Sequence, residues 1–301
     1  MHIEEGVLNN FRVLFIEMGN LVVGIAKDIG PRILYLARKD KRDLNVFGVV
    51  PEISLETPDG VWRIYGGHRL WTSPEAFPRS YSIEDKPVKI YVKEDEIVVE
   101  GNPEPQNCVL KRIIIRRGAD DNSLEVVHKI ENICRWPIQF SCWALTVMRQ
   151  EGVAIIPIKS RCVDEKCLLP DRSIALWPYT KLTDKRLVLG DRYILVKQDP
   201  KTPNPLKIGV NAHEPWAAYY IYEHLFVKTT KKVFEPYPDF NSFIEVYTND
   251  KILELETLGP LKTVNPGDVN THTEVWKLVH IGSMELSEDV IDRYVTKFVV
   301  W

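Results

Sequence analysis

The sequence has few cysteines, no long apolar run and no excess of basic residues. Its 301 residues include five cysteines, and no two of them form a Cys-x-x-Cys pair. The spacings of a zinc ribbon and of a thioredoxin-like redox site are therefore absent. We expect most of the cysteines to be core residues. It stays open whether Cys162 and Cys167, with four residues between them, form a disulfide.

Low hydropathy and balanced charge exclude two classes of partner. The charge-free stretch 137–148 falls well short of the roughly 20 residues that a transmembrane helix needs. With 39 Lys and Arg against 42 Asp and Glu, the chain has a net charge of −3 and no basic excess for a phosphate backbone. We expect no nucleic-acid partner and no membrane association. Residues 1–5 lack the features of a secretory signal, so we expect a cytoplasmic protein.

Helical patterns are scarce, and most of the chain has the pattern of short strands. Apolar, β-branched and aromatic runs recur between Gly, Pro, Asn and Asp residues. Polar and apolar residues alternate along several of these runs, which predicts one wet and one dry face. The predicted strands are residues 11–16, 21–26, 32–36, 88–92, 97–100, 110–116, 124–131, 138–148, 243–248, 252–258 and 273–281.

So many strands exceed what one open sheet usually carries, so two sheets packed face to face are expected. We find no linker and no internal repeat, which predicts a single domain over residues 1–301. Near the C-terminus, Ser287 can cap a helix in which apolar residues recur at helical spacing. The predicted fold class is all-β: a large two-sheet β-sandwich with a C-terminal helix.

Residues 65–75 combine paired glycines with side chains that can carry chemistry. The glycines allow close backbone approach, so His68, Arg69, Trp71 and Glu75 are candidates for one binding loop. The imidazole of His68 is a candidate acid or base because its pKa lies near neutrality. The structural alternative is a tight turn with a stacked tryptophan and a surface ion pair.

Other aromatic and acidic residues are candidates for the same groove. Tyr179 and Trp216 can act as stacking faces for a ligand, and Trp143 lies on an apolar strand that can also be plain core. Glu254 and Glu256 lie two residues apart on a predicted strand and so point to the same face. A solvated face would simply hydrate them, whereas a concave face would make one of them a candidate base.

Two motifs resemble a known family. The run Leu255-Glu256-Thr257 with Pro260 and the turn 265–268 resemble the end of aldose 1-epimerases, the galactose mutarotases, and residues 28–33 are similar to the first turn of mutarotase-like sandwiches. Residues 66–71, 237–239 and 254–260 resemble, more specifically, an uncharacterised family within that superfamily. The resemblance spans most of the chain and implies the β-supersandwich fold, without an established reaction.

The resemblance also implies roles for particular residues. The mutarotase base falls on Glu256, and a histidine that binds the sugar falls on His68. The histidine that serves as general acid falls on Trp143, which cannot donate a proton at neutral pH. We expect a small carbohydrate as the ligand, and we expect neither a cofactor nor a metal. Two hypotheses follow for what the protein does with this ligand.

In the first hypothesis, the protein is an isomerase that interconverts anomers or epimers of a sugar or sugar derivative, with Glu256 as the base. In the second, it binds the sugar without turning it over. The proposed ligand contacts are Arg69, His68, Trp71, Glu75, Trp143, Tyr179, Trp216 and Glu256. A scaffold that binds a partner protein ranks last, since the sequence predicts no amphipathic docking helix other than the C-terminal one.

Three structural expectations follow. Glu256, and not Glu254, lies in the groove. His68 and Arg69 reach the same groove, where the planar guanidinium of Arg69 can hold an anionic substituent. Trp143 either stacks on the sugar ring or faces the sandwich core.

Overall fold

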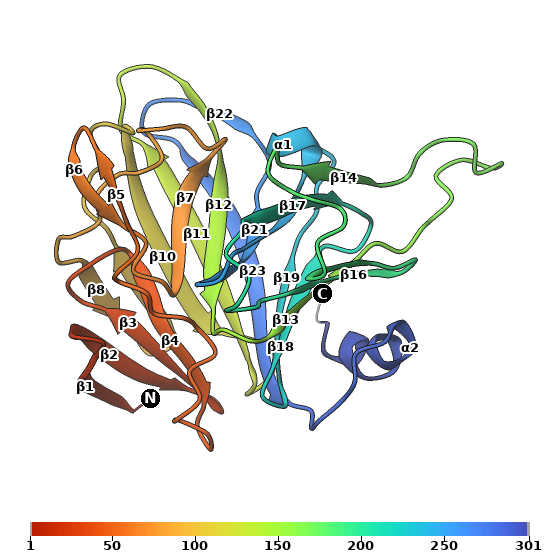
Figure 1. Cartoon of the computed structure of the whole chain (residues 1–301). Helices are drawn as coiled ribbons and strands as arrows, with labels where there is room; N and C mark the ends of the chain where they lie inside the picture. The colour runs from red at the N-terminus through yellow and green to blue at the C-terminus, as the bar shows by residue number, and fades with distance from the viewer. Residues whose placement is uncertain (1, 300–301) are drawn as a thin grey trace.

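Two large antiparallel sheets pack face to face in the computed structural model, which describes residues 2–299 (Figure 1). The larger, 11-stranded sheet contains, in spatial order, β1 (Ile3–Leu8), β2 (Phe11–Met18), β3 (Leu21–Ala26), β4 (Arg32–Arg38), β7 (His68–Ser73), β12 (Ile138–Met148), β21 (Leu253–Leu258), β20 (Ile244–Thr248), β17 (Leu206–Asn211) and β14 (Ser173–Leu176), with β22 (Lys262–Val264) beside β12.

The second sheet has ten strands. In spatial order these are β15 (Leu187–Leu189), β16 (Tyr193–Lys197), β13 (Val153–Pro157), β18 (Trp216–Ile221), β19 (His224–Thr230), β23 (Val269–His280), β11 (Ser123–Asn132), β10 (Val109–Arg117), β9 (Glu96–Glu100) and β8 (Lys89–Val92). A separate hairpin, β5 (Ser54–Thr57) and β6 (Gly60–Arg63), completes the described strands. The predicted all-β, two-sheet sandwich is confirmed.

Alternation along the central strands separates two apolar regions. Successive strand residues point to opposite faces. On β12, Cys142 and Met148 face the ten-stranded sheet and belong to the main core. Trp143, Leu145 and Val147 point away from that sheet and pack in a separate cluster. We call the side of the 11-stranded sheet that faces away from its partner the outer face.

The predicted C-terminal helix is present but irregular. It begins as α2 (Glu288–Val290), continues as the π-helical turn η1 (Ile291–Val295) and ends as the 3-10 turn η2 (Thr296–Phe298). The hydroxyl of Ser287 accepts a hydrogen bond from the Val290 amide at 3.3 Å, as expected for a cap. A four-residue turn, α1 (Pro238–Asn241), lies before β20. None of the helices within residues 2–299 has the length and apolarity to cross a bilayer.

Four of the five cysteines form disulfides. Cys108 bonds to Cys134, and Cys162 bonds to Cys167, with Cα–Cα distances of 5.1 and 4.8 Å. The expectation of plain core residues holds for the buried Cys142 and is wrong for Cys108 and Cys134, because the pairing joins residues 26 apart in the sequence. Disulfides are typical of oxidising compartments, so the cytoplasmic location stays a prediction.

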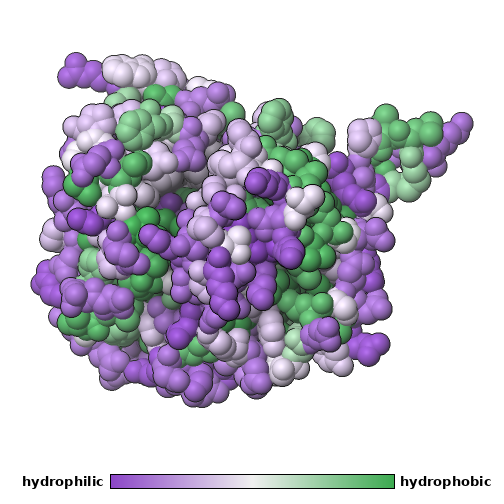
Figure 2. All heavy atoms as spheres, in the orientation of Figure 1, coloured by the Kyte–Doolittle hydropathy of each residue, from purple (hydrophilic) through white to green (hydrophobic). Residues whose placement is uncertain are grey.

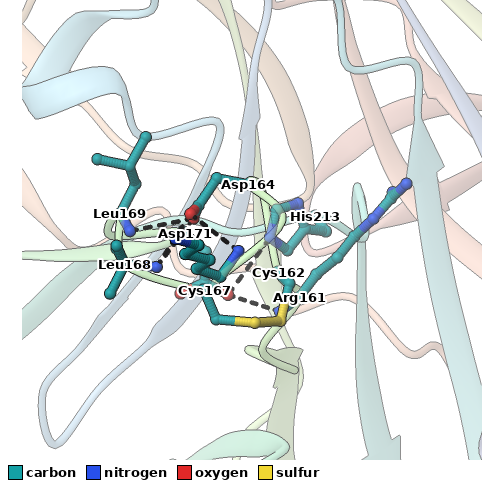
Figure 3. Close-up of a disulfide and its surroundings, with 9 residues drawn as sticks. Arg161, Cys162, Asp164, Cys167, Leu168, Leu169, Asp171 and His213 are labelled. Atoms are coloured by element: carbon teal, nitrogen blue, oxygen red, sulfur yellow. Dashed lines mark hydrogen bonds and ion pairs between the residues drawn. A yellow bond between two sulfur atoms is a disulfide. The ribbon is translucent and has the colours of Figure 1, made fainter.

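The Cys162–Cys167 disulfide lies in a segment between β13 and β14 that projects from the sandwich (Figure 1). Figure 3 shows the Asp164 carboxylate accepting hydrogen bonds from the amides of Leu168 and Leu169, at 2.9 and 3.2 Å. Both leucine side chains are exposed, and Figure 2 shows hydrophobic residues on this projection. The disulfide and the aspartate together hold a compact turn away from the sheets.

Candidate functional site

A pocket of about 480 Å³ opens on the outer face of the 11-stranded sheet. Its floor comes from β7, β12, β17, β20 and β21, and its walls from the β5–β6 hairpin and the loops that follow β7 and β14. Seven aromatic side chains line it: Trp62, Trp71, Tyr81, Trp143, Trp177, Tyr179 and Tyr247. Four charged side chains line it as well: Arg69, Glu75, Lys207 and Glu254.

The strand register brings charged residues from distant parts of the chain into one row. Arg69 on β7 lies opposite Leu145 on β12, and Leu145 lies opposite Glu256 on β21. Glu256 in turn lies opposite Glu245 on β20. Residues that oppose one another across a ladder share a face, so this row lies on the outer face. Arg69 and Leu145 line the pocket, whereas Glu245 and Glu256 lie beneath it.

Arg69 already has a carboxylate partner within the pocket. Its Nη1 lies 2.6 Å from Glu254 Oε1. The guanidinium also lies over the ring of Trp71, 4.5 Å from the ring centroid, which is a cation–π contact. The side chain of Arg69 is buried. An anionic group of a ligand would therefore have to displace Glu254 to bind the guanidinium.

Glu256 lies under the pocket and not in it. Its carboxylate has no exposed surface; Oε2 accepts hydrogen bonds from Trp143 Nε1 at 2.8 Å and Lys207 Nζ at 3.1 Å. Both donors line the pocket, as does Glu254. The expectation that Glu256 rather than Glu254 lies in the groove is therefore corrected: both point to the outer face, but Trp143 and Lys207 cover Glu256. Burial raises the pKa of Glu256, and Lys207 acts in the opposite direction.

Two aromatic rings clamp the lysine at the pocket floor. Lys207 Nζ lies 4.4 Å from the ring centroid of Trp143 and 4.7 Å from that of Trp177. It also lies 2.8 Å from Glu245 Oε2. Burial favours the neutral amine, but the two neighbouring carboxylates outweigh this and raise the pKa of Lys207. The pocket floor therefore holds a charged lysine.

His68 does not reach the pocket. It precedes Arg69 on β7, so its side chain points to the opposite face and is fully buried between the sheets. The expectation that His68 and Arg69 share one groove is wrong because residues 68–73 form a strand and not the loop that the paired glycines suggested. His68 Nδ1 lies 2.8 Å from Thr146 Oγ1, and Nε2 lies 2.7 Å from His128 Nε2 of the facing sheet.

The hydrogen bonds define the tautomers of this buried chain. His128 Nδ1 lies 3.1 Å from the carbonyl oxygen of His272, so it carries the hydrogen and leaves Nε2 as an acceptor. His68 then donates from Nε2 and accepts the Thr146 hydroxyl hydrogen at Nδ1. Burial lowers the pKa of His128 to about 4 and that of His68 well below its usual value. Both imidazoles are therefore neutral at pH 7.

A buried ion pair lies beside the two histidines. Lys228 Nζ lies 2.9 Å from Glu274 Oε1, and neither side chain is exposed. Thr257 and Trp276 also donate to the Glu274 carboxylate, at 2.5 and 2.7 Å. Burial alone would raise the pKa of Glu274, but the charge of Lys228 and, more weakly, the hydrogen bond from Thr257 lower it to about 2.

This cluster also has the donor set of a metal site. The ligand atoms of His68, His128 and Glu274 lie within 4.8 Å of one another, and zinc accepts two histidines and a carboxylate. A divalent cation would place two further positive charges next to Lys228. Within this group of three residues, the Glu274 carboxylate would be the one negative charge to balance them. Each ligating residue is already hydrogen-bonded within the protein. We therefore assign the cluster a structural role in joining the two sheets.

The remaining candidates divide between the pocket and the core. Trp71, Glu75 and Tyr179 line the pocket, as does Trp143. Trp216 does not: it lies on β18 of the other sheet, buried with Tyr193 beneath the C-terminal helix. Its placement as a ligand contact is corrected, because its strand belongs to the ten-stranded sheet.

Two charged residues of the site were not predicted from the sequence. Lys207 and Glu245 each stand within a strand whose neighbours are mostly apolar. A charged residue in such a run is the available signal, because charges are rarely buried without a partner. The sequence does not show that the two strands are adjacent, and their partnership follows from the pairing of β17 with β20.

Comparisons with known proteins identify the fold. No family model matches the sequence, and no curated protein matches it. Solved structures do match. A TPR-domain protein from Parabacteroides distasonis is 12% identical with a TM-score of 0.59; the match covers 92% of this chain but 49% of that one, so the chain spans about half its length.

Two further structures are similar over most of both chains. A protein from Klebsiella pneumoniae, provisionally named an aldose 1-epimerase, is 13% identical with a TM-score of 0.59, and the match covers 93% of this chain and 83% of that one. A galactose mutarotase-like protein from Lactobacillus casei is 11% identical with a TM-score of 0.51, covering 89% and 100%. At such identities the likeness concerns the fold alone. The chain has the fold of a galactose mutarotase-like β-sandwich.

Proposed function

We propose that the protein binds a small, uncharged carbohydrate in the outer-face pocket. The observation that carries this proposal is the lining of the pocket, in which seven aromatic rings surround a few charged and polar groups. Aromatic rings stack on the apolar faces of sugar rings, and polar groups at the rim hydrogen-bond the hydroxyls. The mutarotase-like names of several fold neighbours are consistent with such a ligand.

The charges of the pocket favour a neutral ligand over an anionic one. Both cations, Arg69 and Lys207, are paired with carboxylates. Glu75 contributes a further carboxylate, which accepts a hydrogen bond from the Tyr81 hydroxyl. A phosphate or uronate group would meet this carboxylate and find no unpaired cation among the lining residues, which opposes binding.

Calorimetry with neutral hexoses and their 6-phosphates tests the proposal. We expect a neutral hexose to bind more tightly than its phosphate. Tyr179→Ala should weaken binding about tenfold, equal to about 1.4 kcal/mol, because the exposed ring of Tyr179 forms one wall. Trp136→Ala, at an exposed tryptophan outside the pocket, is the matched control and should leave affinity unchanged. Tighter binding of the phosphate would contradict the charge argument, and no hexose binding at all would contradict the site.

Interconversion of sugar anomers is the second candidate function. It is favoured by one observation: a buried carboxylate with a raised pKa, Glu256, lies directly beneath the pocket. Polarimetry of freshly dissolved hexoses tests it. If Glu256 acts as the base, the wild type should speed the approach to anomeric equilibrium and Glu256→Gln should abolish that gain. Sugar binding without acceleration would leave the protein a non-catalytic binder.

A further inference from the structure

The pocket floor contains more buried carboxyl groups than buried cations. Glu245 and Glu256 lie opposite each other on β20 and β21, and neither has exposed surface. One cation, Lys207, contacts both carboxyl groups, at 2.8 and 3.1 Å. If both carboxyls were ionised, this buried group would carry a net charge of −1. Arg69, on the same row, cannot compensate because it is paired with Glu254.

Several carboxyl oxygens of the same group lack a hydrogen-bond partner. Glu256 Oε2 has two donors, Trp143 and Lys207. Glu256 Oε1 and both oxygens of Glu245 are buried without a hydrogen-bond partner. Lys207 is close enough to Glu245 for an ion pair, but its geometry is not that of a hydrogen bond. Buried carboxylate oxygens without hydrogen bonds are costly, so this arrangement favours a further proton on the group.

We propose that Glu245 keeps its proton at neutral pH and shares it with Glu256, so that Glu245, Glu256 and Lys207 form an electrically neutral group. The proton belongs to Glu245 because Glu256 already accepts two hydrogen bonds from donors that stabilise its charge. One hydrogen bond from Glu245 to Glu256 then supplies partners on both residues. Burial raises the pKa of Glu245 well above its usual value, with Lys207 acting against this and Glu256 adding to it.

The shared proton would allow the pair to act as the general acid, a role that Trp143 cannot fill. This consequence rests on the second candidate function above. Glu256 would take the proton of the anomeric hydroxyl while the pair gives the Glu245 proton to the ring oxygen. The bond between the ring oxygen and the anomeric carbon breaks in the same step, leaving the open-chain aldehyde. The number of protons on the pair is unchanged, and ring closure reverses the step. Trp143 and Lys207, which cover Glu256, must both move aside for the sugar to reach the pair.

Native electrophoresis at pH 7 tests the proton directly. Glu245→Gln replaces a group that we propose to be neutral, so its mobility should match that of the wild type. The matched control is Glu94→Gln, in the exposed turn between β8 and β9, which should shift mobility by one full charge. An equal shift for both variants would overturn the proposal. Circular dichroism establishes that both variants are folded.

Infrared spectroscopy provides a second test. The measurement on the wild type can overturn the proposal by itself and does not depend on the folding of a variant. A protonated carboxyl band should be present at pH 7, and Glu245→Gln should remove it while Glu94→Gln leaves it unchanged. The absence of this band from the wild type would also overturn the proposal. Neither measurement uses a sugar, so a failure of sugar binding or of anomer exchange would contradict the proposed function without touching the shared proton.

Discussion

Replacing Lys228 by methionine is expected to lower the free energy of unfolding by about 3–5 kcal/mol. The substitution leaves the Glu274 carboxylate charged and unpaired in the core between the sheets. Lys228 Nζ also lies 3.4 and 3.2 Å from the carbonyl oxygens of Ala144 and Leu255, which belong to the opposite sheet. Three acceptors therefore each lose one donor, and the sheets lose a direct link.

Denaturant unfolding followed by tryptophan fluorescence measures this loss. Lys89→Met removes an exposed lysine that also pairs with a glutamate, Glu100, and should change stability by at most about 1 kcal/mol. The double variant Lys228→Met with Glu274→Gln removes the stranded charge, so it should be more stable than Lys228→Met alone. A Lys228→Met protein as stable as the Lys89→Met control would show that the ion pair does not hold the core.

Replacing Trp143 by alanine is expected to cost about 3–5 kcal/mol of stability. The side chain is 2% exposed although it lines the pocket. Its ring meets Trp71 edge-on at a centroid distance of 5.7 Å, and its Nε1 donates to Glu256. Alanine would leave a cavity and remove a hydrogen bond from a buried carboxylate. We expect a small effect on sugar affinity, because little of the ring is free to stack.

The same denaturant curves, combined with calorimetry, separate the two roles considered for Trp143. Trp136→Ala is again the control, since it removes an exposed tryptophan and should shift stability by less than about 1 kcal/mol. A Trp143→Ala protein of normal stability that binds sugar tenfold less tightly would instead identify Trp143 as a stacking surface.

The strand pattern was predictable from the sequence because it is local. Alternation with a period of two and turn residues between apolar runs are written in neighbouring positions. The two-sheet sandwich and the Ser287 cap followed from such signals and are confirmed. Local signals also misled: the paired glycines before His68 suggested a loop, whereas residues 68–73 form β7. Once that segment is a strand, His68 and Arg69 must face opposite sides.

The sequence by itself determined the all-β class, the balance of charge and the shared direction of Glu254 and Glu256, because each depends on nearby residues or on composition. Only the tertiary structure decided which of these glutamates meets the pocket, which residues neutralise them and where Trp216 lies. The Glu245–Glu256 and Lys207–Glu256 contacts join residues 11 and 49 apart, and Lys228 reaches a carbonyl 84 residues away. Such partnerships depend on the order and register of strands, which are set by packing over the whole sandwich and leave no local mark in the chain.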